Sequence, residues 1–319
     1  MKKIVILDAF VAAAGGLSWD EISQLGKLTA YDRTEPQDTL NRCKGAFAVF
    51  TNKVLITREI IEQLPELRFI GVLATGYNNV DIAAATEHGI TVCNVPAYST
   101  ESVVQTVFAH ILNLMVDVER HSQSVKAGDW SNCADFSYLL SPTEELFGKT
   151  LGIYGLGNIG RRVAEIAHAF GMKIIALTSK SQEQLPQYIT KVNKNDFFAL
   201  SDVISLNAPL TADNANFICE DSLAMMKPTA VLINTARGGL IDEPALDKAL
   251  RDRRIFAAAL DVLCKEPPSA DNPLLSNPHC RITPHIAWQS TTARRRLISV
   301  SAQNLRAFLD GMPTNVINK

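Results

Sequence analysis

Three ionisable side chains in the second half of the chain have the chemistry needed to reduce a carbonyl group. They are Arg237, Glu266 and His285, and each follows a short apolar run that we expect to be a strand. The runs are Val231–Asn234, Ala257–Leu260 and the residues around Ile282. Ligands of open α/β sheets bind beyond the carboxyl ends of the strands. We therefore expect the arginine, the carboxylate and the imidazole to meet in one crevice.

This set of side chains suits a small 2-keto acid. The planar guanidinium of Arg237 can grip a carboxylate and the adjacent carbonyl oxygen with parallel hydrogen bonds. Hydride addition to the carbonyl carbon leaves an alkoxide that needs a proton, and the imidazole of His285 can supply it at neutral pH. A neighbouring Glu266 would stabilise the imidazolium. Each residue alone could instead be a structural ion pair or an ordinary loop residue, but the combination favours an active site.

A glycine motif earlier in the chain predicts a dinucleotide site. The segment Gly155-Leu156-Gly157-Asn158-Ile159-Gly160 fits GxGxxG, follows the apolar run Thr150–Tyr154 and opens the helical pattern Ile159–Phe170. In this context the first glycine permits a tight turn, the second lets the backbone approach a pyrophosphate, and the third lets the helix pack on the strand. The helix N-terminus then offers free N–H groups to the phosphates. The alternative is a plain glycine turn.

The residues after the next strand bear on which nicotinamide cofactor is bound. An acidic residue is expected about 20 residues beyond the glycine motif, where it holds the adenosine ribose. This chain has Leu177-Thr178-Ser179-Lys180 there, without a carboxylate. Hydroxyl groups and a lysine could bind a 2′-phosphate that a carboxylate would repel, so we expect NADP(H) in preference to NAD(H). The alternative is that Thr178 bonds a plain ribose and Lys180 is solvated.

The elements that must position these residues alternate between strand and helix, which predicts parallel sheets covered on both faces. In the first part of the chain we expect strands at Ile4–Leu7, Ala46–Phe50, Phe69–Ala74 and Thr91–Cys93, and helices at Thr57–Leu64, Val80–His88 and after a capping box at Ser18–Glu21. One long helix is expected at Ser99–Lys126. The second series has strands at Thr150–Tyr154, Lys173–Leu177, Val203–Leu206, Ala230–Asn234, Ala257–Leu260 and Ile282, and helices at Ile159–Phe170, Asp221–Met226, Asp242–Arg251 and Ser290–Leu309.

Composition excludes several other classes of protein. The formal net charge is −2 and no basic stripe stands out, so nucleic acid is not an expected partner. The run Arg294-Arg295-Arg296 is interpreted as a solvated helix face. No apolar run approaches the ~20 residues that a membrane helix needs. The six cysteines contain no CxxC pair, which argues against disulfides or a metal site and favours the cytoplasm.

Over nearly its whole length the sequence resembles the D-isomer-specific 2-hydroxyacid dehydrogenase family, and within it the glycerate dehydrogenase/hydroxypyruvate reductase branch. Asn234–Gly238 matches the arginine motif of that family, with Glu266 and His285 at similar spacings. The other matching segments are Leu73–Asp81, similar to the substrate loop; Asn94–Thr100, similar to the domain junction; and Thr283–Trp288, similar to the histidine motif. The main departure is Thr178, where the family usually has an acid.

The resemblance implies a fold, a site and an assembly. A Rossmann NAD(P)-binding domain (residues 99–287) would be inserted in a flavodoxin-like substrate-binding domain (residues 1–98 and 288–319), both doubly wound parallel sheets. The family is usually a homodimer. The backbone N–H groups of Ala74, Thr75 and Gly76 would bind the substrate carboxylate. Besides the glycine motif and Thr178–Lys180, the cofactor contacts implied are Asn158, Ile159, Ala208, Pro209, Asn214, Thr235, Ala236, Arg237 and Asp261, the last facing the nicotinamide amide.

The substrate expected on this basis is hydroxypyruvate or glyoxylate, with another 2-keto acid as a close variant. Asn52, Lys53 and Trp288 could tune that choice or could be scaffold residues. A different class of function is a non-catalytic, dinucleotide-sensing protein like the C-terminal binding protein corepressors, which resemble this family. Fold alone does not fix function, so the choice must rest on the site residues. The presence of all three catalytic residue types disfavours the non-catalytic alternative. A formate or phosphite dehydrogenase would need pocket residues that we do not find.

Overall fold

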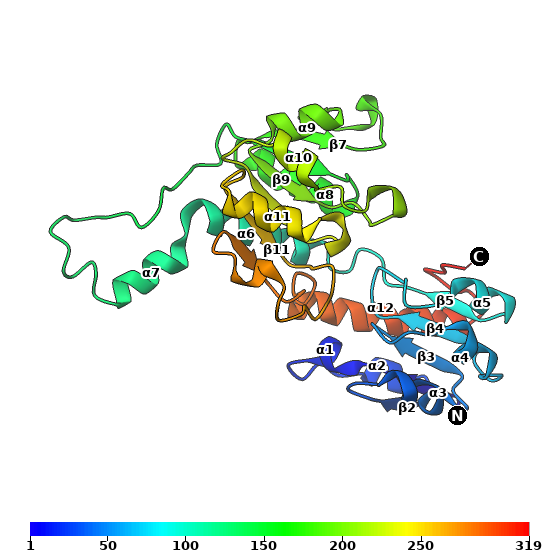
Figure 1. Cartoon of the computed structure of the whole chain (residues 1–319). Coiled ribbons are helices and arrows are strands. Elements are labelled where there is room, and N and C mark those ends of the chain that lie inside the picture. Colours follow the sequence, from blue (N-terminus) through cyan, green and yellow to red (C-terminus); the bar gives the residue numbers. More distant parts are fainter. Residues whose placement is uncertain (319) are drawn as a thin grey trace. The chain divides into compact units, whose positions relative to one another are not determined.

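The computed structural model describes residues 1–318, and the chain divides into two compact units. The first unit is Met1–Ser99 with Trp288–Lys319, and the second is Thr100–Ala287. Each unit has its own sheet in which every strand pair is parallel (Figure 1). The expected α/β class with two doubly wound parallel sheets is therefore confirmed.

The sheet of the first unit has the strand order β2-β1-β3-β4-β5, which is the flavodoxin-like order. The strands are β1 Lys3–Ile6, β2 Lys27–Ala30, β3 Ala48–Thr51, β4 Phe69–Val72 and β5 Thr91–Cys93. All residues of β3 and β4 are buried, because helices cover both faces of the central strands. Alternate residues point to opposite faces, so Ile4 and Ile6 join one core and Val5 joins the other.

The helices of the first unit are short except for the last. They are α1 Ala9–Ala13, α2 Asp20–Ser23, α3 Thr39–Cys43, α4 Arg58–Glu62, α5 Ile82–Glu87 and α12 Thr291–Leu309, with the 3-10 turn η1 Pro36–Asp38. Helix α12 begins where the hydroxyl of Ser290 accepts the backbone N–H of Ala293 at 3.2 Å. Its Leu297 and Leu305 are buried in the same core as Phe69 of β4. The C-terminal helix thus closes one face of the first sheet.

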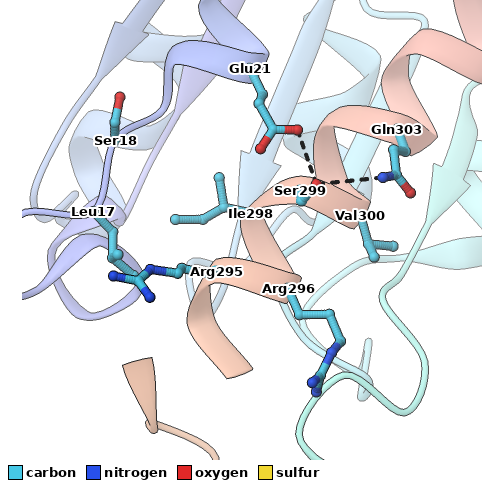
Figure 2. A pocket seen from close by; sticks show the side chains of 9 residues that line it. All are labelled: Leu17, Ser18, Glu21, Arg295, Arg296, Ile298, Ser299, Val300 and Gln303. Carbon is cyan, nitrogen blue, oxygen red and sulfur yellow. Dashed lines mark hydrogen bonds between the residues drawn. The ribbon is translucent and has the colours of Figure 1, made fainter. Parts of the chain in front are cut away.

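Two details of the first unit contradict the sequence analysis. There is no capping box at Ser18, because α2 has no side-chain cap and Glu21 instead bonds Ser299 of α12 at 3.0 Å. The arginine run is not simply a solvated face either: Arg294 is 9% exposed and donates to the backbone carbonyls of Gln289 and Ala14. Arg295 and Arg296 are exposed, and both line an open pocket of about 540 Å³. Figure 2 shows the residues that line it: Leu17, Ser18, Glu21, Arg295, Arg296, Ile298, Ser299, Val300 and Gln303.

The sheet of the second unit has the order β12-β11-β10-β9-β6-β7-β8. The strands are β6 Thr150–Tyr154, β7 Lys173–Leu177, β8 Ile189–Lys191, β9 Val203–Leu206, β10 Val231–Asn234, β11 Ala257–Leu260 and β12 Cys280–Ile282. Counted within the unit, this is the Rossmann order with one extra strand. The order reverses between β6 and β9, and dinucleotides bind at such switch points.

The helices of the second unit are α6 Thr100–Val116, α7 Val118–Lys126, α8 Asn158–Ala169, α9 Lys194–Leu200, α10 Glu220–Met225 and α11 Glu243–Arg251, with 3-10 turns η2 Gln182–Gln184, η3 Ala212–Asn214, η4 Gly238–Leu240 and η5 Pro273–Ser276. The single long helix expected at Ser99–Lys126 is wrong. Asp117 adopts a left-handed conformation (φ 52°) and separates α6 from α7, which aspartate tolerates better than most residues. Beyond it, α7 and the following loop extend away from the sheet of this unit as an arm (Figure 1). Within residues 1–318, no helix is both long and apolar enough to cross a membrane.

Candidate active site

The glycine motif forms the turn between β6 and α8, and the turn needs two of its glycines for close packing. Gly155 has φ +88°, and a Cβ built there would lie 2.6 Å from the backbone nitrogen of Ala208. A Cβ at Gly160 would lie 2.2 Å from the carbonyl oxygen of Gly155. Both positions therefore exclude any larger residue.

Gly157 differs from the other two glycines because nothing lies within 4 Å of its would-be Cβ. It is the exposed N-cap of α8, and it leaves an open cradle in front of the first N–H groups of that helix. Such a cradle beside a helix N-terminus fits a phosphate group, which needs close backbone approach and free N–H donors. The residues present thus fit a dinucleotide at the switch point of the sheet.

The segment after β7 is tied back to the glycine turn by a lysine. Lys180 Nζ donates to the carbonyl oxygen of Leu156 at 2.9 Å, and the Thr178 hydroxyl accepts the N–H of Lys180 at 3.3 Å. Lys191 of β8 in turn donates from its Nζ to the carbonyl oxygen of Lys180 at 2.6 Å. Lys180 is therefore not a merely solvated residue, and the ammonium groups of Lys180 and Lys191 both bond backbone carbonyls of the glycine turn and of the segment after β7.

The other implied cofactor residues lie in the loops after β9 and β10. Ala208 and Pro209 follow β9, and the Asn214 amide donates to Tyr154 and to the carbonyl of Pro209. Asn207, which the sequence analysis did not single out, directly follows the same strand. Its Oδ1 is buried and has no hydrogen-bond partner among the described residues. This acceptor lies just after β9, next to the switch point of the sheet.

Arg237 lies in a loop that the buried side chain of Asn234 shapes. Asn234 is 0% exposed, accepts the N–H of Ala236 at 3.0 Å and donates to the carbonyl of Arg237 at 2.8 Å. The Arg237 side chain is exposed, and one guanidinium nitrogen donates to the carbonyl of Ala236. Asn234 at the strand end thus fixes the backbone of the loop. In the described bonds only one nitrogen of the guanidinium group is used.

Glu266 and His285 form a close pair at the ends of β11 and β12. Glu266 Oε2 lies 2.5 Å from His285 Nδ1, while Oε1 accepts the N–H of Leu263 at 3.0 Å. The side chains are 35% and 27% exposed, so neither is removed from solvent. Because a carboxylate can only accept, a proton on Nδ1 faces Glu266 in this pair.

The loops that carry Arg237 and Glu266 touch each other through their backbones. A Cβ built at Gly238 would lie 2.0 Å from the carbonyl carbon of Leu263, so only glycine fits beside that segment. Leu263 in turn donates to Glu266, and Glu266 meets His285. The structure therefore brings together the three loops expected to carry the chemistry.

Asp261, which the resemblance places at the nicotinamide amide, is buried and hydrogen-bonded within its own unit. Its carboxylate is 1% exposed and accepts the Thr283 hydroxyl at 2.6 Å and the N–H groups of Ile286 and Ala287 at 2.9 and 2.8 Å. These donors all belong to the loop around His285. In the structure, Asp261 therefore anchors the histidine loop.

A buried glutamate that the sequence analysis missed supports the Glu266 loop. Glu243, at the start of α11, is 9% exposed and accepts the N–H of Cys264 at 2.6 Å and the amide of Asn272 at 2.8 Å. Burial, helped by the charge of Glu243, raises the pKa of the Cys264 thiol to about 11. The thiol therefore stays protonated at neutral pH, and its Sγ lies 3.5 Å from the carbonyl oxygen of Ile241.

The residues expected to bind the substrate carboxylate lie in the first unit, in the loop after β4. The Thr75 hydroxyl donates to the carbonyl of Val95, and the Asn94 amide donates to that of Thr75. These bonds fix the loop, yet no hydrogen bond among residues 1–318 uses the backbone N–H groups of Ala74, Thr75 or Gly76. Three successive unused donors are suited to an anion.

Asn52 and Lys53 lie in a neighbouring loop of the first unit that Asp8 holds. The Asp8 carboxylate accepts the N–H groups of Asn52 and Lys53 at 2.8 and 2.6 Å. The Asn52 amide donates to the carbonyl of Leu73 at 2.5 Å, so in these hydrogen bonds Asn52 has a scaffold role. Trp288, in the same unit, packs edge-on against Tyr98, with ring centroids 6.2 Å apart.

The second unit thus has a dinucleotide cradle and a histidine–carboxylate pair along one sheet. A family model described as "D-isomer specific 2-hydroxyacid dehydrogenase, NAD binding domain" matches residues 108–287, more than half of the chain. The chain belongs to the D-isomer-specific 2-hydroxyacid dehydrogenase family. It is therefore an oxidoreductase that acts on CH–OH donors with a nicotinamide cofactor, as the sequence analysis expected.

Individual members of this family match over almost the full chain. The chain is 40% identical over 321 residues to the hydroxypyruvate reductase of Blautia hydrogenotrophica, covering 99% of this chain and 100% of that protein. It is 40% identical over 323 residues to the glycerate dehydrogenase of Methylorubrum extorquens, covering 99% of each. Among solved structures, an acyclic imino acid reductase (Bsp5) in complex with NADPH and D-Arg has a TM-score of 0.86 at 31% identity, covering 99% of both chains. The two named enzymes confirm the glycerate dehydrogenase branch.

Proposed function

We propose that this protein reduces hydroxypyruvate or glyoxylate to the corresponding hydroxy acid. The observation that carries the proposal is the 2.5 Å contact between Glu266 and His285. It occurs at the carboxyl edge of the same sheet that carries the open glycine cradle at Gly157. Hydroxypyruvate or glyoxylate is proposed as the substrate because two relatives that match almost the full chain are named hydroxypyruvate reductase and glycerate dehydrogenase.

The proposed roles follow from the chemistry of each side chain. When bound, the nicotinamide cofactor supplies the hydride. His285 donates the proton to the developing alkoxide from Nε2, while Glu266 stabilises its charged form. Arg237 holds the substrate carboxylate and carbonyl oxygen with its exposed fork. The unused N–H groups of Ala74–Gly76 supply further carboxylate contacts.

We propose that the preferred cofactor is NADP(H). Support comes from the side chains after β7, where Lys180 and Lys191 provide two positive charges and Thr178 and Ser179 provide hydroxyls. No carboxylate lies among Thr178, Ser179 and Lys180 to repel a 2′-phosphate. The NADPH complex of the imino acid reductase is consistent with this preference.

We propose that the protein is a homodimer that works in the cytoplasm. The arm of the second unit carries exposed apolar side chains, which in a monomer would form an unusually apolar surface. They include Val118, Trp130, Phe136 and Leu139, with Phe136 90% exposed. Light scattering should give twice the chain mass, and Phe136→Ser with Leu139→Ser should shift it towards the monomer. The cytoplasmic location is supported by six free cysteines.

The test of substrate and cofactor is a grid of initial rates. Hydroxypyruvate, glyoxylate and pyruvate are each supplied with NADH and with NADPH, and the nicotinamide absorbance is followed. Fast turnover of hydroxypyruvate or glyoxylate with NADPH is expected. Turnover with NADH alone would keep the reaction and overturn the cofactor preference. Dinucleotide binding without turnover of any pair would favour another keto acid or the dinucleotide-sensing alternative.

A pair of lysine variants sharpens the cofactor test. Lys180→Ala should raise the KM for NADPH roughly tenfold, the effect of losing one hydrogen bond between charged groups. The KM for NADH should change less, because NADH lacks the 2′-phosphate. Lys173→Ala, at the other end of β7, is the matched control and should leave both values unchanged. Equal effects of Lys180→Ala on both cofactors would remove Lys180 from phosphate recognition.

A further inference from the structure

His285 has a backbone conformation that its surroundings must hold. Its φ is +53°, in the left-handed region that side chains other than glycine rarely adopt. The N–H of His285 donates to the carbonyls of Asp261 and Thr283, both at 2.9 Å. The next two N–H groups, of Ile286 and Ala287, donate to the Asp261 carboxylate. The direction of the imidazole therefore depends on the position of that carboxylate.

The Asp261 carboxylate is buried without a positive partner. It is 1% exposed, and within residues 1–318 no lysine, arginine or histidine forms an ion pair with it. A buried charge without a counter-ion is stabilised by hydrogen bonds, and each one lost is costly. Besides the two backbone N–H groups, its donor is the Thr283 hydroxyl at 2.6 Å. Thr283 is thus the only side chain in the described bonds that fixes this carboxylate.

The direction of the hydrogen bonds extends this arrangement to α6. A hydroxyl has one proton, and a carboxylate only accepts, so the proton of Thr283 Oγ1 points to Asp261 Oδ1. His110 Nε2, 3.3 Å from the same hydroxyl oxygen, must then be the donor. His110 is 7% exposed, and burial lowers its pKa although the charge of Asp261 opposes this. A neutral His110 with its proton on Nε2 satisfies the geometry.

We propose that Thr283, assisted by His110, is a positioning residue for the proton donor of this enzyme. Its hydroxyl fixes the Asp261 carboxylate, and that carboxylate holds the turn that directs His285 towards Glu266. The inference rests on the proposed role of His285 as proton donor. Neither Thr283 nor His110 touches Glu266 or His285 through its side chain in the described hydrogen bonds. They act through Asp261.

The kinetic test compares substitutions that remove or keep the hydroxyl. Thr283→Val should lower kcat roughly 10- to 100-fold, because small displacements of a reacting group have effects of this size. The KM for the nicotinamide cofactor should stay within about twofold, and Thr283→Ser should restore most of kcat. His110→Leu should lower kcat less, since it is one step further away, and His110→Gln, which keeps an N–H donor, should recover activity.

A control in the same unit separates positioning from general stability. Ser222 is 1% exposed, and its hydroxyl bonds the backbone of Cys219 at the start of α10. Ser222→Ala should lower the melting temperature while leaving kcat unchanged. The inference is overturned if Thr283→Val lowers the melting temperature but keeps kcat within twofold of the unaltered enzyme. It is equally overturned if Thr283→Ser loses as much kcat as Thr283→Val.

A second readout needs no turnover, so it separates failure of this inference from failure of the proposed reaction. Amide hydrogen exchange of a peptide spanning residues 283–288 reports the N–H groups that Asp261 accepts. Thr283→Val should accelerate exchange at Ile286 and Ala287, whereas Ser222→Ala should not. Unchanged exchange in Thr283→Val would refute the positioning chain even in an enzyme that proves active on another keto acid.

Discussion

Replacing Glu266 by glutamine removes the charge beside His285 while keeping the length of the side chain. In the structure the two carboxylate oxygens have different partners: Oε2 meets His285 Nδ1 at 2.5 Å, and Oε1 accepts the N–H of Leu263 at 3.0 Å. An amide has one oxygen, so its NH2 group must face one of these two donors. Glu266→Gln therefore loses either the partner of the imidazole or the anchor of its own loop.

The size of the effect follows from the exposure of the pair. A hydrogen bond to a charged group contributes about 1.5 to 3 kcal/mol. Because the side chains of His285 and Glu266 are 27% and 35% exposed, solvent screens them and the lower half of that range applies. About 1.5 to 2 kcal/mol corresponds to a loss of roughly 10- to 30-fold in kcat.

The assay is steady-state turnover with the best keto acid and cofactor from the grid of initial rates. The KM for the cofactor should be unchanged, because the described bonds of Glu266 go to Leu263 and His285, which belong to the loops after β11 and β12. Glu144→Gln is the control, since Glu144 pairs with Lys149 at 2.8 Å but is 59% exposed and should contribute little. A kcat for Glu266→Gln within twofold of the unaltered enzyme would show that the charge is not needed.

The remaining predictions concern the other two proposed catalytic residues and the buried histidine. His285→Ala should lower kcat by ~10² to 10⁴-fold while dinucleotide binding, measured by nicotinamide fluorescence, is retained; unchanged turnover would rule out the proton-donor role. Arg237→Lys should raise the substrate KM strongly, because the bidentate fork is lost, and a KM within twofold would remove Arg237 from the site. Because burial lowers the pKa of His110, the unfolded chain takes up this proton at higher pH than the folded chain, so folding stability falls as the pH drops through and below the ordinary histidine range. The melting temperature of His110→Gln minus that of the unaltered enzyme should therefore increase as the pH falls from about 7.5 to 5. A decrease of this difference would contradict the reasoning.

The central strands are predictable from the sequence because they are buried on both faces. The runs Thr150–Tyr154, Lys173–Leu177 and Val203–Leu206 coincide with β6, β7 and β9. Continuous apolar runs of this length are typical of parallel strands. The edge strands β2 and β8 were missed, since they contain lysine and threonine and are half exposed, which is how edges avoid pairing with other chains.

The helix boundary at Asp117 could not be predicted from local sequence. Residues on both sides favour helix, and neither proline nor glycine interrupts the pattern. The left-handed turn there depends on how the arm leaves the unit, which is a tertiary property. Local preference is a weak guide wherever packing decides the backbone.

The residue types of the site are readable from the sequence, but their support is not. Arg237, Glu266 and His285 follow strands, and the parallel topology brings their loops together. The bonds of Thr283 with His110 and Asp261 join three elements far apart in the chain, so no spacing reveals them. The supporting role of Glu243 is not readable either. An acid in the first turn of a helix is already explained by the helix dipole, so its sequence position does not point to the Glu266 loop.

The place of β12 in the sheet has a consequence for how the enzyme would lose activity. This strand has three residues and a single neighbour, β11, yet it leads directly to His285. The ends and edges of a sheet open more readily than its centre. The turn that carries His285 would therefore detach in partial unfolding while the central strands remain paired. In moderate denaturant, inactivation should precede the loss of secondary structure, so that an enzyme still folded by circular dichroism would already be inactive.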